Sequence, residues 1–335
     1  MDMKAIWLCE IPENIEKVYG AENRQAIRRM AMMEEAVYTK EDVLRNRESF
    51  ERVEVIFSTW GMPSFSEEEI RSIFPQLKAV FYAAGSVQGF ARPFLHCHIK
   101  VFSAWAANGV PVAEYTTAQI VLANKGFFAA GRWMSNGLVE QARAVFSHYP
   151  GNYGEKVGII GAGMIGKLVI GMLKQYQLQV KVFDPFLPEE AAITLGVEKC
   201  SLEEIFAECL VVSNHLANNQ QTTGMLTGQH FASMRPYATF LNTGRGAQVV
   251  EAELAAVLRE RPDLTAILDV TEPEPPEAGH AFYELPNCIL TPHIAGSSGS
   301  EVHRMAEYMK QEYERFVRNV QCRYEVTLQM LDTMA

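Results

Sequence analysis

The sequence predicts an α/β protein with two doubly wound domains, each built on a parallel sheet. Short apolar runs alternate with helical patterns along the whole chain, which is typical of strands joined by crossover helices. The chain has 335 residues, 48% of them hydrophobic, which is more than one hydrophobic core usually organises. The alternation also stops and restarts near the middle of the chain, so two sets of strands are expected.

The first hundred residues contain four predicted strands with helices between them. The strands lie near residues 4–8, 53–58, 78–83 and 100–103. Asn108-Gly-Val-Pro111 then interrupts the pattern, and a segment compatible with a long helix begins at Ala113. We therefore expect the chain to cross from one domain to the other near residue 110.

A second interruption at residues 149–154 contains one proline and two glycines, and a predicted strand at 157–160 follows it. The alternation of strands and helices restarts there. Further strands are predicted at residues 179–183, 210–216, 239–242, 265–270 and 288–291.

Two helices of this second half begin with capping-box patterns, Ser201 with Glu204 and Ser298 with Glu301. The second of them is the last predicted helix, and it carries an apolar stripe at steps of three and four residues. The stripe consists of Val302, Ala306, Met309, Tyr313, Phe316 and Val320. Such a helix needs a partner surface, which we expect in the first domain.

Charge and cysteine usage limit the possible partners. A formal net charge of -10 provides no long-range attraction for nucleic acid or for an anionic membrane. The six cysteines form no C-x-x-C pair and no zinc-like spacing, which suits reduced thiols in the cytoplasm and predicts no metal site. The most apolar helix candidate, residues 113–134, carries three charges and is not expected to span a membrane. A small molecule is therefore the expected partner.

A glycine motif, Gly161-Ala-Gly163-Met-Ile-Gly166, lies between a predicted strand and a predicted helix, which is the context of a dinucleotide fingerprint. Its first glycine allows the tight turn, its second lets the backbone approach a pyrophosphate, and its third lets helix and strand pack closely. The helix N-terminus offers N–H groups to the phosphates. The alternative is a glycine-rich turn in some other βα unit.

Asp184 lies eighteen residues beyond this motif, at the end of the next predicted strand. A carboxylate there would accept hydrogen bonds from an adenosine ribose and would repel a 2′-phosphate. NAD is therefore favoured over NADP as the cofactor.

Four stretches of this sequence resemble the D-isomer-specific 2-hydroxyacid dehydrogenase family, in the family's order and spacing. They are EKVGIIGAGMIGKL (155–168), FLNTGRGAQVVEAEL (240–254), LDVTEPEPP (268–276) and LTPHIAGSS (290–298). The resemblance spans most of the chain. It implies an oxidoreductase that uses NAD and acts on a small 2-hydroxy or 2-keto acid, in the manner of glyoxylate and hydroxypyruvate reductases.

The family fold implies a Rossmann domain for NAD at residues 111–298. This domain would be inserted into a flavodoxin-like substrate domain formed by residues 1–110 and 299–335. The resemblance also implies a homodimer built through the cofactor domain, with residues 113–149 as its arm.

Reduction of a 2-keto acid needs a cation for the carboxylate, a proton donor for the developing alkoxide and a nicotinamide. Arg245 follows a predicted strand and would pair bidentately with the carboxylate while polarising the carbonyl group. His293 is the predicted acid, protonated for reduction and neutral for oxidation. By the family pattern, Glu274 would lie beside His293, hold its ring and favour the protonated form.

Each of these three residues has a structural alternative when it is taken alone: a histidine at a strand end, an arginine that caps a turn and a glutamate in a solvated loop. Their joint occurrence after the cofactor motif favours the catalytic interpretation. A second alternative is an NAD(H)-sensing binding protein, because the family includes a corepressor with the same fold and the same three residues. A sensor would bind NADH but would hardly oxidise it.

The resemblance assigns further residues to the ligands. Those for the cofactor are Met164 and Ile165 at the pyrophosphate, Leu216, Thr243 and Gly244 along the cofactor, and Asp269 at the nicotinamide amide. In the first domain, Ala84-Gly85-Ser86 would offer backbone N–H groups to the substrate carboxylate.

The sequence also departs from the family. Most relatives have Asp where Val87 stands, so the substrate turn would be held differently here. His215-Leu-Ala-Asn218 lacks the proline that relatives carry after the fourth cofactor-domain strand. Formate dehydrogenases have Gln where Glu274 stands, so formate is not the expected substrate.

Overall fold

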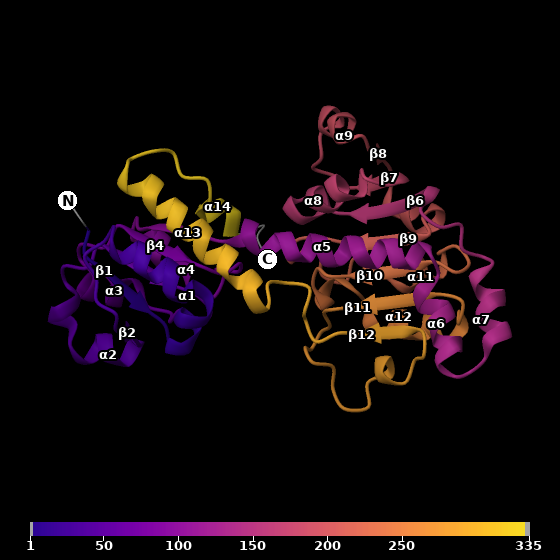
Figure 1. The fold of residues 1–335 in the computed structure, drawn as a ribbon, viewed down its shortest axis with the longest axis horizontal. Helices are drawn as coiled ribbons and strands as arrows, with labels where there is room; N and C mark the ends of the chain where they lie inside the picture. The colour runs from indigo at the N-terminus through magenta and orange to yellow at the C-terminus, as the bar shows by residue number, and fades with distance from the viewer. Residues whose placement is uncertain (1–2, 332–335) are drawn as a thin grey trace. The chain divides into compact units, whose positions relative to one another are not determined.

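The computed structural model of this protein describes residues 3–331 and forms two compact units (Figure 1). The first unit combines Met1–Gly109 with Ser297–Ala335, and the second unit is Val110–Gly296. Each unit contains one sheet whose main strands are parallel, which confirms the predicted fold class. Within residues 3–331, no helix has the length and apolar character needed to cross a membrane.

The first unit has a six-stranded sheet in the order β13-β5-β4-β3-β1-β2. Its strands are β1 (Ala5–Leu8), β2 (Val37–Tyr38), β3 (Val55–Ser58), β4 (Ala79–Tyr82), β5 (Lys100–Ser103) and β13 (Glu325–Val326). The first five strands are parallel, and their order is the flavodoxin-like one. The short strands β2 and β13 were not predicted, and β13 pairs antiparallel with β5.

The helices of the first unit cover this sheet. They are α1 (Pro12–Arg28), α2 (Lys40–Arg45), α3 (Glu67–Ile73), α4 (Ala91–His96), α13 (Val302–Val317) and α14 (Leu328–Leu331), with 3-10 turns η1 (Arg47–Phe50) and η4 (Gly299–Glu301). Helix α13 packs against α1, β4 and β5, so its apolar stripe has the predicted partner. Val320 is the exception, because it lies beyond the helix and is 48% exposed.

The second unit has a seven-stranded parallel sheet in the order β12-β11-β10-β9-β6-β7-β8. Its strands are β6 (Tyr153–Ile160), β7 (Gln177–Phe183), β8 (Glu198–Lys199), β9 (Val211–Asn214), β10 (Thr239–Asn242), β11 (Thr265–Leu268) and β12 (Cys288–Leu290). From β8 to β11 this is the Rossmann order, with the switch point between β6 and β9. Ligands bind such sheets at the carboxyl ends of the strands, beside the switch point.

Helices cover both faces of this second sheet. They are α5 (Trp105–Asn124), α6 (Phe127–Ser135), α7 (Val139–Phe146), α8 (Met164–Leu173), α9 (Glu189–Leu195), α10 (Leu202–Glu208), α11 (Gly228–Ala232) and α12 (Glu251–Glu260), with 3-10 turns η2 (Gly246–Gln248) and η3 (Ala281–Tyr283). Successive strand residues alternate between two cores. Ile159 packs in the core that includes residues of α5, α8 and α9, whereas Ile160 packs in the core of α10, α11 and α12.

The predicted interruption at Asn108–Pro111 is wrong, because α5 runs through it with Pro111 as its seventh residue. Proline lacks the N–H that would bond to the carbonyl of Ala107, which normally disfavours a helix interior. Burial compensates here, since Ala107 and Ala113 on either side are fully buried. The division between the two units falls inside α5, after Gly109. The later interruption is also shorter than predicted, because β6 already begins at Tyr153.

Candidate active site

The turn between β6 and α8 contains three glycines, and the absence of a side chain has a different structural consequence at each of them. Gly161 has a φ of +89°, and a Cβ atom there would lie 2.8 Å from the carbonyl oxygen of His215. At Gly166, a Cβ atom would lie 2.1 Å from the carbonyl oxygen of Gly161, so helix and strand could not pack. A Cβ atom at Gly163 would meet no described atom within 4 Å, so the second glycine leaves space for an external group.

Helix α8 begins directly after this turn with Met164 and Ile165, which are half-buried. No side chain caps its first backbone N–H groups. Free N–H groups and the positive end of the helix dipole form a site for phosphate. The open space at Gly163 and this helix end therefore fit the pyrophosphate of a dinucleotide.

Asp184 follows β7 and supports the glycine turn. Its carboxylate accepts a hydrogen bond from the backbone N–H of Ala162 at 2.7 Å and another from that of Phe186 at 2.8 Å. The N–H of Gly161 donates to the carbonyl oxygen of Phe183 at 2.8 Å. The acid predicted to bind the ribose thus also positions the backbone of the glycine turn.

Two buried asparagines at neighbouring strand ends order the segments that the sequence assigns to the cofactor. Asn214 ends β9 and Asn242 ends β10, and the Nδ2 of Asn214 donates to the Oδ1 of Asn242 at 3.0 Å. The N–H of Leu216 donates to Asn214 at 3.2 Å, and the N–H of Gly244 donates to Asn242 at 3.0 Å. Thr243, which is also buried, forms a hydroxyl–hydroxyl hydrogen bond of 3.2 Å with Thr116. Neither asparagine was predicted as a site residue, although an amide at two successive strand ends is visible in the sequence.

Arg245 directly precedes the 3-10 turn η2 as its N-cap residue, and its Nη1 donates to the carbonyl oxygen of Gly244 at 2.7 Å. Burial lowers the pKa of its guanidinium, and the nearby carboxylate of Glu274 acts in the opposite direction. A Cβ atom at Gly246 would lie 2.0 Å from the carbonyl carbon of Thr271. The loop that carries Arg245 is therefore packed directly on the segment that leads to Glu274.

His293 and Glu274 form a hydrogen-bonded pair, with 2.7 Å between Nδ1 and Oε1. Their side chains are 45% and 41% exposed, so the pair is accessible to a ligand. Across residues 3–331, Nε2 of His293 has no hydrogen-bond partner and remains free for a proton transfer. The three predicted catalytic residues thus lie in one cluster within the second unit, because Glu274 interacts with both His293 and Arg245.

Asp269 holds the backbone that presents His293, which has an unusual φ of +54°. Its buried carboxylate accepts from the Thr291 hydroxyl at 2.5 Å and from the N–H groups of Ile294 and Ala295 at 2.8 and 2.9 Å. The N–H of His293 donates to the carbonyl oxygen of Asp269 at 3.0 Å. These bonds stabilise a backbone conformation that is strained for histidine. The sequence assigned Asp269 only to the nicotinamide amide and missed this function.

The predicted substrate turn, Ala84-Gly85-Ser86, follows β4 in the first unit. The hydroxyl of Ser103 donates to the carbonyl oxygens of Ala84 and Gly85 at 2.9 and 2.6 Å. Val87, which follows this turn, is fully buried in the core. A serine on the neighbouring strand therefore holds this turn.

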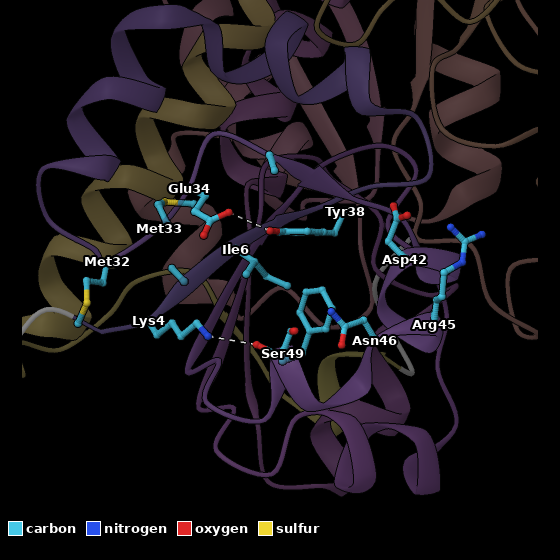
Figure 2. A pocket seen from close by; sticks show the side chains of 13 residues that line it. Lys4, Ile6, Met32, Met33, Glu34, Tyr38, Asp42, Arg45, Asn46 and Ser49 are labelled. Atoms are coloured by element: carbon cyan, nitrogen blue, oxygen red, sulfur yellow. Dashed lines mark hydrogen bonds between the residues drawn. The ribbon is translucent and has the colours of Figure 1, made fainter.

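A cavity of 730 Å³ lies in the first unit, between β1, β2 and α2 (Figure 2). Lys4 points toward Ser49 and Tyr38 toward Glu34, each joined by a hydrogen bond (Figure 2). None of the predicted site residues lines this cavity. In the described part of the chain, no group of three or more His, Cys, Asp or Glu side chains could hold a metal ion.

This chain is similar to known proteins in both sequence and structure. The family model for the NAD binding domain of D-isomer specific 2-hydroxyacid dehydrogenases matches residues 117–295. YoaD of Bacillus subtilis, a protein assigned to the 2-hydroxyacid dehydrogenases, is 31% identical over 204 residues, which are 60% of this chain and 58% of YoaD. The chain thus spans less than two thirds of that relative.

One further sequence relative and one solved structure are also similar to this chain. The (S)-sulfolactate dehydrogenase of Chromohalobacter salexigens is 29% identical over 248 residues, which are 72% of this chain and 77% of that protein. The crystal structure of a phosphoglycerate oxidoreductase from Rhizobium etli has a TM-score of 0.81 at 21% identity, covering 98% of this chain and 99% of the other. At this identity the structural match shows a shared fold.

Proposed function

Because the chain belongs to the D-isomer specific 2-hydroxyacid dehydrogenase family, we propose that it transfers a hydride between NAD(H) and a small 2-hydroxy or 2-keto acid. The observation that carries the proposal is the 2.7 Å bond between His293 and Glu274, with Arg245 beside that glutamate. These groups supply an acid, its partner and a cation for a substrate carboxylate. They belong to the same unit as the glycine turn.

NAD(H), when bound at the glycine turn, would supply or accept the hydride at the substrate α-carbon. Arg245 pairs with the carboxylate of the keto acid and stabilises negative charge on the neighbouring carbonyl oxygen. Nε2 of His293 gives its proton to that oxygen, which completes the hydroxyl group. Glu274 at Nδ1 fixes the orientation of the ring and stabilises its charged form. In the oxidative direction, the neutral imidazole takes the hydroxyl proton back.

NAD is the proposed form of the nicotinamide cofactor. The carboxylate of Asp184 lies at the end of β7, where it would accept hydrogen bonds from the ribose hydroxyls and repel a 2′-phosphate. Its existing contacts with the turn at Ala162 support this placement.

The proposed assembly is a homodimer through the cofactor unit. The segment from the end of α5 through α7 exposes large apolar side chains that a partner would cover. Examples are Leu122, Phe127, Met134 and Phe146, which are 38%, 57%, 52% and 48% exposed. A cytoplasmic location is also proposed, since all six cysteines are free thiols. Light scattering of the purified protein tests the dimer.

The proposed activity is tested by mixing the protein and NADH with glyoxylate, hydroxypyruvate, pyruvate and larger 2-keto acids. The loss of NADH absorbance with at least one of them is the expected result. The alternative is an NAD(H)-sensing protein, which would bind NADH in a fluorescence titration and oxidise it with none of the acids. That second outcome would overturn the enzyme proposal.

A further inference from the structure

Gln248 is a fully buried amide between the two loops of the candidate active site. Its Nε2 donates to the carbonyl oxygens of Leu216 and Ala217 at 2.8 and 3.0 Å. Its Oε1 accepts from the Nδ2 of Asn214 at 2.6 Å and from the backbone N–H of Arg245 at 3.1 Å. One side chain therefore joins the loop after β9 to the loop after β10.

These four bonds use the whole hydrogen-bonding capacity of a glutamine side chain, which has two N–H donors and an oxygen with two lone pairs. Leucine would remove all four bonds in a buried place, and a carboxylate would have no proton for the two carbonyl oxygens. The local backbone is adapted to this amide as well. A Cβ atom at Gly244 would lie 2.7 Å from Oε1 of Gln248, so a residue larger than glycine would displace it.

We propose that Gln248 is a positioning residue, which fixes the position of Arg245 relative to the cofactor-lining segment at Leu216. The Nε2 of Gln248 donates to the carbonyl oxygens of Leu216 and Ala217 in the loop after β9. Its Oε1 accepts from the backbone N–H of Arg245 in the loop after β10. The part concerning Arg245 rests on the proposed function, because it assumes that Arg245 binds the substrate carboxylate. The part concerning Leu216 requires only that the protein binds a nicotinamide dinucleotide.

Two variants separate the halves of the amide. Gln248→Leu removes all four bonds. Gln248→Glu has nearly the same shape and keeps the acceptor contacts with Asn214 and Arg245, but as a carboxylate it loses both donor contacts. The matched control is Asn287→Leu, because Asn287 is also buried in this unit and its Nδ2 donates to two carbonyl oxygens, those of Leu258 and Arg261, at 3.0 and 3.2 Å.

The experiment measures the Kd of NADH without substrate, the KM and kcat with a 2-keto acid, and the Tm of each protein. Gln248→Glu is expected to raise the Kd of NADH roughly tenfold and to change the KM of the acid by less than about threefold. Gln248→Leu is expected to raise both constants roughly tenfold or more. Asn287→Leu is expected to lower the Tm and to leave both constants within about twofold of the wild type.

The proposal is overturned if the Gln248 variants lower the Tm as Asn287→Leu does while the Kd and the KM stay at wild-type values. If Gln248→Leu does not fold, the near-isosteric Gln248→Glu decides the question by its Kd for NADH. If the wild type reduces no keto acid, the proposed function fails. The Kd of NADH still tests the contact with Leu216 in that case, so the two failures can be told apart.

Discussion

The carboxylate of Asp184 accepts a hydrogen bond from the backbone N–H of Ala162, 2.7 Å away, inside the glycine turn. Sequence patterns predict an acid at this place for the ribose, but the structure gives it a second partner within the protein. A change at Asp184 should therefore affect the turn as well as the choice between NAD and NADP.

Asp184→Asn and Asp184→Ala separate these two effects. Asparagine carries no charge but can still accept a hydrogen bond from the N–H of Ala162 through Oδ1. Alanine has neither the charge nor an acceptor. We expect both variants to lower the preference for NADH over NADPH by about tenfold or more, and alanine to bind NADH more weakly than asparagine. Fluorescence titrations with both dinucleotides measure this. An unchanged ratio of the two Kd values in both variants would remove Asp184 from the ribose site.

Glu274→Gln tests the partner of His293. Glutamine can occupy the same place but does not stabilise a charged imidazole, so keto acid reduction should slow by about tenfold to a hundredfold. The matched control is Glu277→Gln, an exposed glutamate of the same loop, whose turnover should match that of the wild type. Equal turnover of both variants would contradict the role of Glu274.

Local patterns predicted much of this fold. The glycine turn, the strand before it and the helix after it were all predicted, because their constraints act between residues near one another in the sequence. The capping box at Ser201 and Glu204 is confirmed for the same reason. The continuous α5 was not predicted, since tertiary burial outweighs the effect of Pro111 there.

The contacts that organise the site could not be predicted from sequence patterns. Gln248 looks like an ordinary polar residue after the glycine of an Arg-Gly pair, and only the position of β9 beside β10 shows that its amide spans two loops. Asp269 similarly holds the loop of His293 through backbone N–H groups. Almost every residue type has such a group, so no sequence pattern marks these contacts. Strand β13 was missed because two residues form no pattern.

Glu251 should make stability depend on pH. Its carboxylate accepts from the N–H of Glu272 at 2.9 Å, and burial raises its pKa from 4.5 to about 7. A raised pKa means that the folded state favours the protonated carboxyl group. The resulting stabilisation is fully present below about pH 4.5 and is lost as the pH rises through about 7.

Glu251→Gln should remove this loss, because an amide keeps an acceptor for Glu272 without a titrating charge. Relative to the wild type, the variant should gain on the order of 1–3 kcal/mol of unfolding free energy as the pH rises from 4.5 to 8. Denaturant unfolding across this range measures it, with the exposed Glu260→Gln as control. A difference that does not change with pH would contradict the titration of Glu251.

Glu312 should contribute strongly to the stability of the first unit. Its buried carboxylate accepts from the N–H groups of Arg323 and Tyr324 at 2.7 and 3.0 Å, which fixes the segment before β13. Glu312→Ala should cost about 2–4 kcal/mol, since two backbone N–H groups lose a buried, charged acceptor. Glu140→Ala, which removes an exposed ion pair with Arg143, should change stability by less than about 0.5 kcal/mol. Similar thermal unfolding of both variants would argue against this role of Glu312.

His293 is the proposed proton donor, and the variant His293→Asn removes this donor. Asparagine tolerates the φ of +54° at this position but cannot act as an acid. Turnover of NADH with the best 2-keto acid should fall by about a hundredfold or more, while the Kd of NADH stays within about twofold of the wild type. Turnover at the wild-type rate in this variant, with NADH binding intact, would contradict the account.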